Sequence, residues 1–324
     1  MAAAKFKKSS ENNITGEATI NELPENILLQ IMSYLTMKDR CRLRRVCQKW
    51  NQIMNYDSLW RHVDLLEFPI GLKTLWRLVR TRFSPRMSVL KLRGYDPLDG
   101  DHKRKKSLSD AVLKKIAACC PNLQVLHLKN CRTETIKFES LPTSIVCLEI
   151  VDCYLVPGWM ADKQKHLPKL EHLNLDYSDC FDDVDMCYIC DWSNLKYLSM
   201  INDFVGNEGV ITIANNLCEL EYLNICWTDI DDDAVYHITQ HLKKLRQLCL
   251  AECCRVTDKG IVEIATGLPM LDRLDISHCC LVTMRGLETL FDGSIRELIA
   301  VGLTELSNKD KRALKRSFAV TRFR

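Results

Sequence analysis

Long apolar runs are missing from this sequence. The first 19 residues, MAAAKFKKSSENNITGEAT, contain no apolar core of the length that a secretory signal peptide has. No later segment approaches the roughly 20 consecutive apolar residues that a membrane-spanning helix needs. We therefore expect a protein that does not enter a membrane and that works in the cytoplasm, the nucleus or both. In these compartments the 17 cysteines are expected to be reduced.

An excess of charge of one sign is also missing, because 45 basic residues nearly balance 42 acidic ones and leave a net charge of +3. This balance argues against nucleic acid as the main partner. The sequence likewise lacks a glycine-rich phosphate loop and a convincing nucleophile–base pattern. We therefore expect a non-enzymatic protein without a cofactor.

Residues 23–65 form a short segment whose pattern differs from the rest of the chain. Pro24 suits the first turn of a helix, and Thr36 with Asp39 suits the start of a second one. About forty residues in three short helices make a marginal domain. Either a partner covers its apolar residues, or they pack internally and against the segment that follows. In the first helix these residues recur at helical spacing and form one broad face: Ile27, Leu28, Ile31, Met32 and Leu35.

This segment resembles an F-box in the order and spacing of many residues. The matching residues are Leu23, Pro24, Ser33, Tyr34, Leu35, Asp39, Val46, Cys47, Trp50, Leu59 and Trp60. The resemblance implies binding to the small Skp adaptor, which bridges to a cullin scaffold and its RING subunit in an SCF ubiquitin ligase. It assigns Trp50 and Trp60 to holding the segment together, and assigns docking on the Skp adaptor to Leu23, Pro24, Leu28, Ile31, Met32 and Leu35.

Three residues depart from the F-box pattern. Met32 stands where phenylalanine is frequent, Thr36 where proline is common, and Arg40 where leucine is common. Methionine is still apolar and threonine is a good helix cap, so the first two changes are compatible with the resemblance. Arg40 places a charge at a usually apolar position, which puts the contact made by the second helix in doubt.

Leucine recurs with a regular period through the rest of the chain. The second leucine of each LxxLxL unit falls at Leu126, Leu148, Leu173, Leu198, Leu223, Leu248, Leu274 and Leu298, at intervals of 22, 25, 25, 25, 25, 26 and 24 residues. These intervals lie within the leucine-rich-repeat range. Each unit is expected to form a strand and then a helix, and a single unit cannot bury its own apolar face. The sequence therefore predicts an α/β fold: a small all-helical module followed by a right-handed solenoid with parallel strands on the concave side and helices on the convex side.

A small residue is expected at the tight turn after each strand. These positions hold Cys131, Cys153, Ser178, Asp203, Thr228, Cys253 and Cys279. Sequence segments such as ECCRVTDKGI resemble the cysteine-containing leucine-rich repeats that are commonly joined to an F-box. From Leu23 to about Leu303 the chain is thus similar to the F-box/leucine-rich-repeat family, and LWRHVDL and SLPTSIVCLEIVDC look closest to one branch of it.

These patterns divide the chain into five segments. We expect a disordered tail at 1–19, an F-box at 20–66, a linker helix at 67–88 and a solenoid at 89–304. A polar insertion near 96–108 carries the basic run Lys103 to Lys106, and a basic segment at 305–324 caps the open end of the solenoid. Such basic runs are most often solvated surface, although a nuclear-localisation signal or a phosphate contact is an alternative.

Strand alternation predicts the surface that contacts a client protein. The residues between the inward leucines should face the concavity, and aromatic and arginine side chains dominate binding energy at interfaces. The predicted client-binding residues are Lys129, His172, Asp176, Tyr197, Tyr222, Trp227 and Arg273.

Two other groups of residues resemble chemical sites. Cys187 and Cys190 form one CxxC without a matching second pair, and the remaining cysteines recur once per repeat, so we expect no metal site and no redox centre. The acidic groups Asp182, Asp183 and Asp185, and Asp229 with Asp231 to Asp233, precede predicted helices. There we expect them to cap helix N-termini rather than to bind calcium.

The favoured interpretation is a substrate-recognition subunit of an SCF-type ubiquitin ligase, which delivers a protein client for ubiquitination and proteasomal degradation. A leucine-rich-repeat scaffold that binds a protein without ubiquitin transfer is the alternative. A nucleic-acid-binding protein that uses the basic runs is a third hypothesis, and its affinity would fall steeply with salt.

Overall fold

The computed structural model describes residues 20–68, 70–94, 108–163, 165–179, 182–201, 204–318 and 320–322. The predicted tail at 1–19 and the basic run Lys103 to Lys106 lie outside these residues. The chain divides into two compact units between Leu59 and Trp60. In the part of the chain described here, no helix combines the length and the apolarity needed to cross a membrane.

The first unit is helical, with the short 3-10 helix η1 (Ile20–Glu22) followed by α1 (Glu25–Ser33), α2 (Met37–Leu43) and α3 (Gln48–Ile53). Thr36 caps α2, and its Oγ1 accepts a hydrogen bond from the Asp39 amide at 3.2 Å. The Cys47 thiol caps α3 by accepting from the Trp50 amide at 3.5 Å. These N-caps begin α2 and α3 shortly after the preceding helix ends, which gives the predicted three-helix module.

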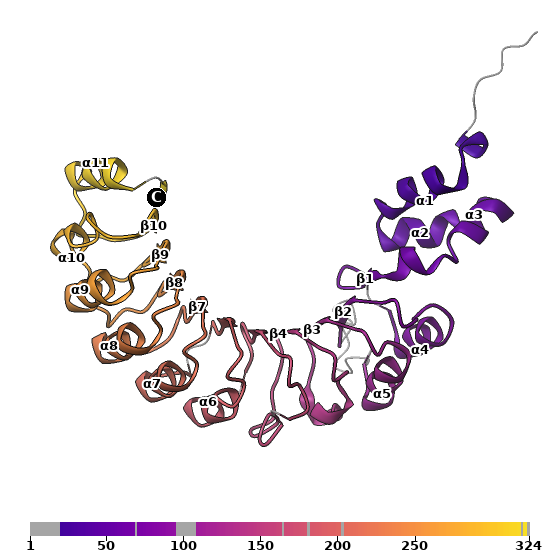
Figure 1. The fold of residues 1–324 in the computed structure, drawn as a ribbon, viewed down its shortest axis with the longest axis horizontal. Coiled ribbons are helices and arrows are strands. Elements are labelled where there is room, and N and C mark those ends of the chain that lie inside the picture. The colour runs from indigo at the N-terminus through magenta and orange to yellow at the C-terminus, as the bar shows by residue number, and fades with distance from the viewer. Residues whose placement is uncertain are drawn as a thin grey trace, which may run out of the picture. The chain divides into compact units, whose positions relative to one another are not determined.

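The second unit is a solenoid built on one parallel sheet whose strands follow each other in sequence order. Figure 1 shows the strands of this unit on the inner side of a curve and the helices on the outer side. The predicted fold class is therefore confirmed. The strands are β1 (His62–Asp64), β2 (Val89–Arg93), β3 (Val125–Lys129), β4 (Cys147–Val151), β5 (His172–Asn174), β6 (Tyr197–Ser199), β7 (Tyr222–Asn224), β8 (Gln247–Cys249), β9 (Arg273–Asp275), β10 (Glu297–Ile299) and β11 (Val320–Arg322).

The period-defining leucines pair with one another along the sheet. Leu126 lies beside Leu148, Leu148 beside Leu173, and the register continues in this way to Leu298. All eight side chains are buried. The core is therefore a continuous leucine ladder between the sheet and the outer layer, which one repeat alone could not bury.

The sheet extends beyond the predicted solenoid at both ends. β1 pairs in register with β2, so the sheet starts inside the segment predicted as F-box, and α4 (Leu72–Thr81) occupies the predicted linker helix. At the other end, α11 (Asn308–Ser317) is followed by β11, which pairs with β10. Leu314 and Phe318 are buried in this last segment.

The outer layer is less regular than predicted. Helices cover most repeats: α5 (Asp110–Cys119), α6 (Asp183–Ile189), α7 (Asn207–Asn216), α8 (Asp232–His241), α9 (Asp258–Gly267) and α10 (Met284–Glu288). Between β4 and β5, however, the described residues form turns and no helix. Between β3 and β4 the chain forms only the 3-10 turns η3 (Thr133–Thr135) and η4 (Phe138–Ser140). That repeat is the shortest, and Pro142 prevents a helix from continuing through it.

Candidate functional site

Helix α1 separates its apolar residues into two stripes. Leu28 and Met32 form the buried stripe, with 0% and 2% of their surface exposed. Ile27 and Ile31, four residues apart, form an outer stripe that continues at Tyr34, and these side chains are 38%, 39% and 80% exposed. Residues four apart lie above one another on a helix, so the outer stripe is a continuous apolar surface. We call Leu23, Pro24, Ile27, Ile31, Tyr34 and Leu35 the α1 ridge.

The six predicted docking residues divide between these two environments. Pro24 and Ile31 are exposed, and Leu23 and Leu35 are half-buried. Leu28 and Met32 are buried in this conformation, and their part in docking stays a prediction. They support the α1 ridge from below. Ile27 and Tyr34 are not among the predicted docking residues, yet they are exposed on the same face of α1 as Ile31.

Arg40, the departure from the F-box pattern, has a structural role inside the first unit. Its guanidinium donates to the carbonyl of Ser33 at 2.6 Å and to the carbonyl of Leu59. Burial lowers the pKa of this guanidinium, which nevertheless stays charged. Arg40 thus satisfies the last turn of α1 and ties it to the end of the unit, a task that an apolar residue could not perform.

Replacement of Arg40 by methionine is expected to lower the free energy of unfolding of the first unit by about 1–2 kcal/mol, because two carbonyl contacts are lost while an apolar stem remains. Thermolysin cleavage within residues 20–59 would report the change as a faster rate. Arg42→Met is the matched control, since Arg42 is two residues away and mostly exposed. Equal effects of the two substitutions would contradict the role of Arg40.

Trp60, which was predicted to hold the helical segment together, belongs to the second unit. It is buried, and the guanidinium carbon of Arg82 lies 5.6 Å from the centre of its ring. Trp50 is half-buried in α3 of the first unit. The two tryptophans therefore serve different units.

The concave face of the solenoid carries a stack of three rings. His172 and Tyr197 stack with centroids 3.7 Å apart and planes within 8°, and Tyr197 and Tyr222 stack at 4.0 Å and 7°. The stack follows from parallel register, because these residues occupy the same strand position in β5, β6 and β7. Burial raises the pKa of both tyrosines and lowers that of His172, so all three rings are neutral at pH 7. They offer a flat, rigid contact surface.

The other predicted client residues lie around this stack. Lys129 pairs with Asp152 at 3.0 Å, and Asp176 accepts a hydrogen bond from the Ser199 hydroxyl at 2.6 Å. Arg273 pairs with Glu297 at 3.6 Å and, with Tyr222, lines a hollow of about 100 Å³. Trp227 is 52% exposed and lines a separate hollow of about 290 Å³. Their part in client binding stays a prediction.

Trp227 is held in an unusual backbone conformation. Its φ is 61°, and Tyr177, at the same position two repeats earlier, has a φ of 57°. Large side chains rarely adopt such left-handed angles. Here the turn follows the strand, and the next residue, Ser178 or Thr228, is buried. The turn therefore presents the two aromatic side chains to solvent.

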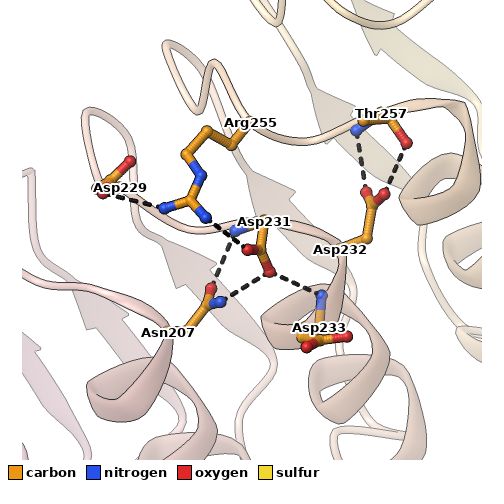
Figure 2. A network of polar contacts seen from close by, with 7 residues as sticks. All are labelled: Asn207, Asp229, Asp231, Asp232, Asp233, Arg255 and Thr257. Atoms are coloured by element: carbon orange, nitrogen blue, oxygen red, sulfur yellow. Dashed lines mark hydrogen bonds and ion pairs between the residues drawn. The ribbon is translucent and has the colours of Figure 1, made fainter.

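The acidic cluster before α8 is used for helix capping and for joining repeats (Figure 2). Asp231 Oδ1 accepts from the Asp233 amide at 3.0 Å and from the Asn207 side chain at 2.7 Å, while Arg255 donates to Asp231 at 2.9 Å and to Asp229 at 3.1 Å. Burial alone would raise the pKa of Asp231, but these hydrogen bonds and the charge of Arg255 hold it below its ordinary value. Protein donors thus occupy the Asp231 carboxylate, as the capping interpretation predicts.

Asp232 connects two successive repeats. Its Oδ1 accepts from the amides of Thr257 at 2.9 Å and Gly260 at 3.0 Å, and its Oδ2 accepts from the Thr257 hydroxyl at 2.6 Å. Thr257 is the N-cap of α9, so a carboxylate from α8 satisfies the first turn of the next helix. A Cβ on Gly260 would lie 2.5 Å from Asp232 Oδ1, which explains the glycine at this close approach. Asp258 makes the equivalent contacts with Thr283 at the start of α10.

The cysteines at the turn positions form an internal ladder. Cys131, Cys153, Cys253 and Cys279 are buried. Cys279 donates to the carbonyl of Leu250 in the preceding repeat at 3.0 Å, and Cys253 donates to that of Ile225 at 3.3 Å. Asp203, the turn residue of another repeat, lies outside the described residues. Of the CxxC pair, Cys187 is exposed, and burial raises the pKa of Cys190 to about 12.

Comparison with known proteins places these two units in context. Residues 20–66 match the F-box-like family. F-box/LRR-repeat protein 12 of Homo sapiens is 31% identical over 237 residues, which is 72% of this chain and 72% of the relative. The Bos taurus protein of the same name is 30% identical over 239 residues, again 72% of each chain. F-box/LRR-repeat protein 5 of Danio rerio is 33% identical over 57 residues, 18% of this chain and 8% of the relative. These matches agree with the resemblance and with the branch that LWRHVDL and SLPTSIVCLEIVDC indicate.

Proposed function

Because the chain belongs to the F-box/LRR-repeat family, we propose that it is the client-recognition adaptor of an SCF-type ubiquitin ligase. In this role the first unit binds the Skp adaptor, which connects the chain to the cullin scaffold and its RING subunit. The solenoid binds a protein client, which is ubiquitinated and degraded by the proteasome. Such an adaptor works in the cytoplasm or the nucleus.

The α1 ridge is the observation that carries this proposal. A folded module that keeps Leu28 and Met32 inside still leaves Ile27, Ile31 and Tyr34 exposed on one helix face. A helix with an internal core normally turns polar residues to solvent on its other face. A second apolar stripe is typical of a helix that packs against a partner on that side.

The adaptor contributes to the reaction through proximity. A client held on the concave face presents its lysines near a ubiquitin thioester that other subunits supply. Conversion of a bimolecular encounter into a reaction within one assembly raises the effective concentration of the reacting groups. The ring stack of His172, Tyr197 and Tyr222 supports a binding role for this face, because it is rigid and only half-buried.

Reconstitution tests the proposal. The full chain, the Skp adaptor, the cullin and the RING subunit are mixed and separated by size-exclusion chromatography. We expect all four to elute together, and we expect the chain to remain separate from the cullin when the Skp adaptor is left out. A chain that elutes alone in the presence of the other three would contradict the proposal. Depletion of the chain in cells distinguishes a ligase adaptor from a scaffold. Depletion of an adaptor should lengthen the half-life of the client, whereas depletion of a scaffold would leave the half-life of a bound protein unchanged.

Tyr222→Ala is expected to weaken client binding by about 2 kcal/mol, roughly 30-fold, because it removes one end of the ring stack and one wall of the adjoining hollow. Proximity labelling during proteasome inhibition would show the client enrichment lost while the Skp adaptor remains labelled. Tyr236→Ala is the control, since Tyr236 is 46% exposed on the convex helix α8. Unchanged client labelling with Tyr222→Ala would show that the client binds at another surface of the chain.

A further inference from the structure

Four side chains that can bind a metal meet on three neighbouring strands of the concave face. Parallel register places Cys147 of β4 beside His172 of β5, and His127 of β3 beside Glu149 of β4. All four are half-buried. They lie on the concave side of the sheet, because they alternate along the strands with buried residues such as Leu148.

Three of these side chains converge on one point. The ligand atoms of Cys147, Glu149 and His172 all lie within 4.8 Å of one another. The Cys147 Sγ is 3.8 Å from Glu149 Oε1, and His172 Nε2 is 4.0 Å from the same oxygen. In a tetrahedral zinc site with Zn–S of about 2.3 Å and Zn–N or Zn–O of about 2.0 Å, ligand atoms lie roughly 3.3–3.5 Å apart. Small side-chain rotations would therefore close the three groups around one ion.

The fourth residue, His127, holds the carboxylate in place. His127 Nδ1 lies 2.6 Å from Glu149 Oε2, whereas the distances given above from Cys147 and His172 are to Oε1. This close contact is the main cause of the lowered pKa of Glu149, so the carboxylate is ionised. A ligand whose second oxygen is fixed in this way is typical of metal sites, in which outer residues orient the ligands.

We propose that Cys147, Glu149 and His172 bind a divalent transition metal, with Zn²⁺ as the best match, and that His127 positions Glu149. A set of one thiolate, one imidazole and one carboxylate suits zinc better than calcium or magnesium, which take oxygen ligands. A water molecule would supply the fourth ligand of a tetrahedral site. The site goes beyond the adaptor function, because it does not require the Skp adaptor.

Binding requires one proton to leave. Burial, with the Glu149 charge, raises the pKa of Cys147 to about 12, so the free thiol is protonated at pH 7. Formation of the Zn–S bond releases this proton to solvent, and the ion gives up bound water for the three protein ligands. The imidazole of His172 is already neutral, since burial lowers its pKa. The charge of Lys91 favours the ionised form of Glu149 when no metal is bound.

Titration of the reduced full-length chain with Co²⁺ tests the proposal, because cobalt occupies zinc sites and a Co²⁺–thiolate bond gives a charge-transfer absorption band. We expect a band that saturates at one Co²⁺ per chain and disappears when Zn²⁺ is added. Cys147→Ser and His172→Gln should abolish it, and His127→Gln should weaken binding by 10–100-fold. Circular dichroism and thermal melting check that each variant is folded, and Zn²⁺ should raise the melting temperature of the wild-type chain but not of Cys147→Ser.

Cys190→Ser is the matched control, because Cys190 is also half-buried and belongs to the CxxC pair. The band should survive this substitution. Absence of stoichiometric Co²⁺ binding would overturn the proposal. So would a band that Cys147→Ser leaves unchanged, or one that disappears only with Cys190→Ser.

Discussion

Replacement of Ile31 by aspartate is expected to weaken binding of the purified Skp adaptor at least 100-fold while the chain stays folded. The Ile31 side chain is 39% exposed at the centre of the α1 ridge, so aspartate is accommodated in the free protein. In the complex the substitution removes an apolar contact and buries an unpaired carboxylate, which together cost about 3–4 kcal/mol. Because each 1.4 kcal/mol is about tenfold in affinity, this loss is at least 100-fold.

Isothermal titration calorimetry with the full chain measures this effect, and Val262→Asp supplies the control. Val262 is also β-branched and lies on a helix, α9, where it is 40% exposed. It belongs to the convex side of the solenoid, so its substitution should leave the affinity for the Skp adaptor unchanged. Leu35→Asp should behave like Ile31→Asp. If both Ile31→Asp and Leu35→Asp bound the Skp adaptor with wild-type affinity, the α1 ridge would not be part of the interface.

Asp232→Ala is expected to lower the free energy of unfolding by about 3 kcal/mol, because it removes three hydrogen bonds to a charged acceptor and leaves two amides at the start of α9 without their partner. The three donors that lose their acceptor are the Thr257 amide, the Thr257 hydroxyl and the Gly260 amide. In a solenoid each repeat depends on its neighbours, so loss of one junction weakens the whole array. Urea denaturation followed by circular dichroism should show an earlier midpoint or a separate first transition.

Asp233→Ala controls for the local helix and for the loss of a negative charge. Asp233 is the next residue of α8 and is exposed, and its carboxylate is not the one that reaches α9 (Figure 2). We expect a change below about 1 kcal/mol for this substitution. Equal losses for the two variants would mean that charge near the helix start, and not the bridge between repeats, provides the stability.

The period of the leucines was sufficient to predict the solenoid. Leu126, Leu148 and their counterparts define the register, and parallel pairing of identical positions follows from stacking of identical units. The irregular repeat between β3 and β4 was not predicted. A 3-10 turn and an α-helix can bury the same apolar residues, so the apolar pattern does not distinguish them. Phe138 is fully buried there in η4, and its pattern alone does not reveal the type of turn.

Side-chain environments were harder to predict than elements. The sequence showed that α1 carries more apolar residues than a small core needs, but it could not decide which of two adjacent residues, Ile31 or Met32, faces inward. That choice depends on how α1 and α3 pack. Arg40 was read as a conflict with the F-box pattern, and only the positions of the Ser33 and Leu59 carbonyls reveal its use.

The cluster around Glu149 was missed for a related reason. The sequence pattern shows cysteine pairs along the chain, whereas this cluster brings together single residues from different repeats. Cys147 and His172 are 25 residues apart, which is the repeat length. A comparison of equivalent positions in successive repeats could have found both this pair and the ring stack of His172, Tyr197 and Tyr222.

Photo-cross-linking at Tyr34 is the most direct test of the central claim, that the α1 ridge is the surface on which the Skp adaptor docks. Tyr34 is 80% exposed, so a benzoylphenylalanine in its place is tolerated and reports on what covers the ridge. We predict a cross-link to the Skp adaptor in cells from this position and none from the same probe at Tyr236. Absence of the cross-link at position 34, with the Skp adaptor still bound to the chain, would contradict the account.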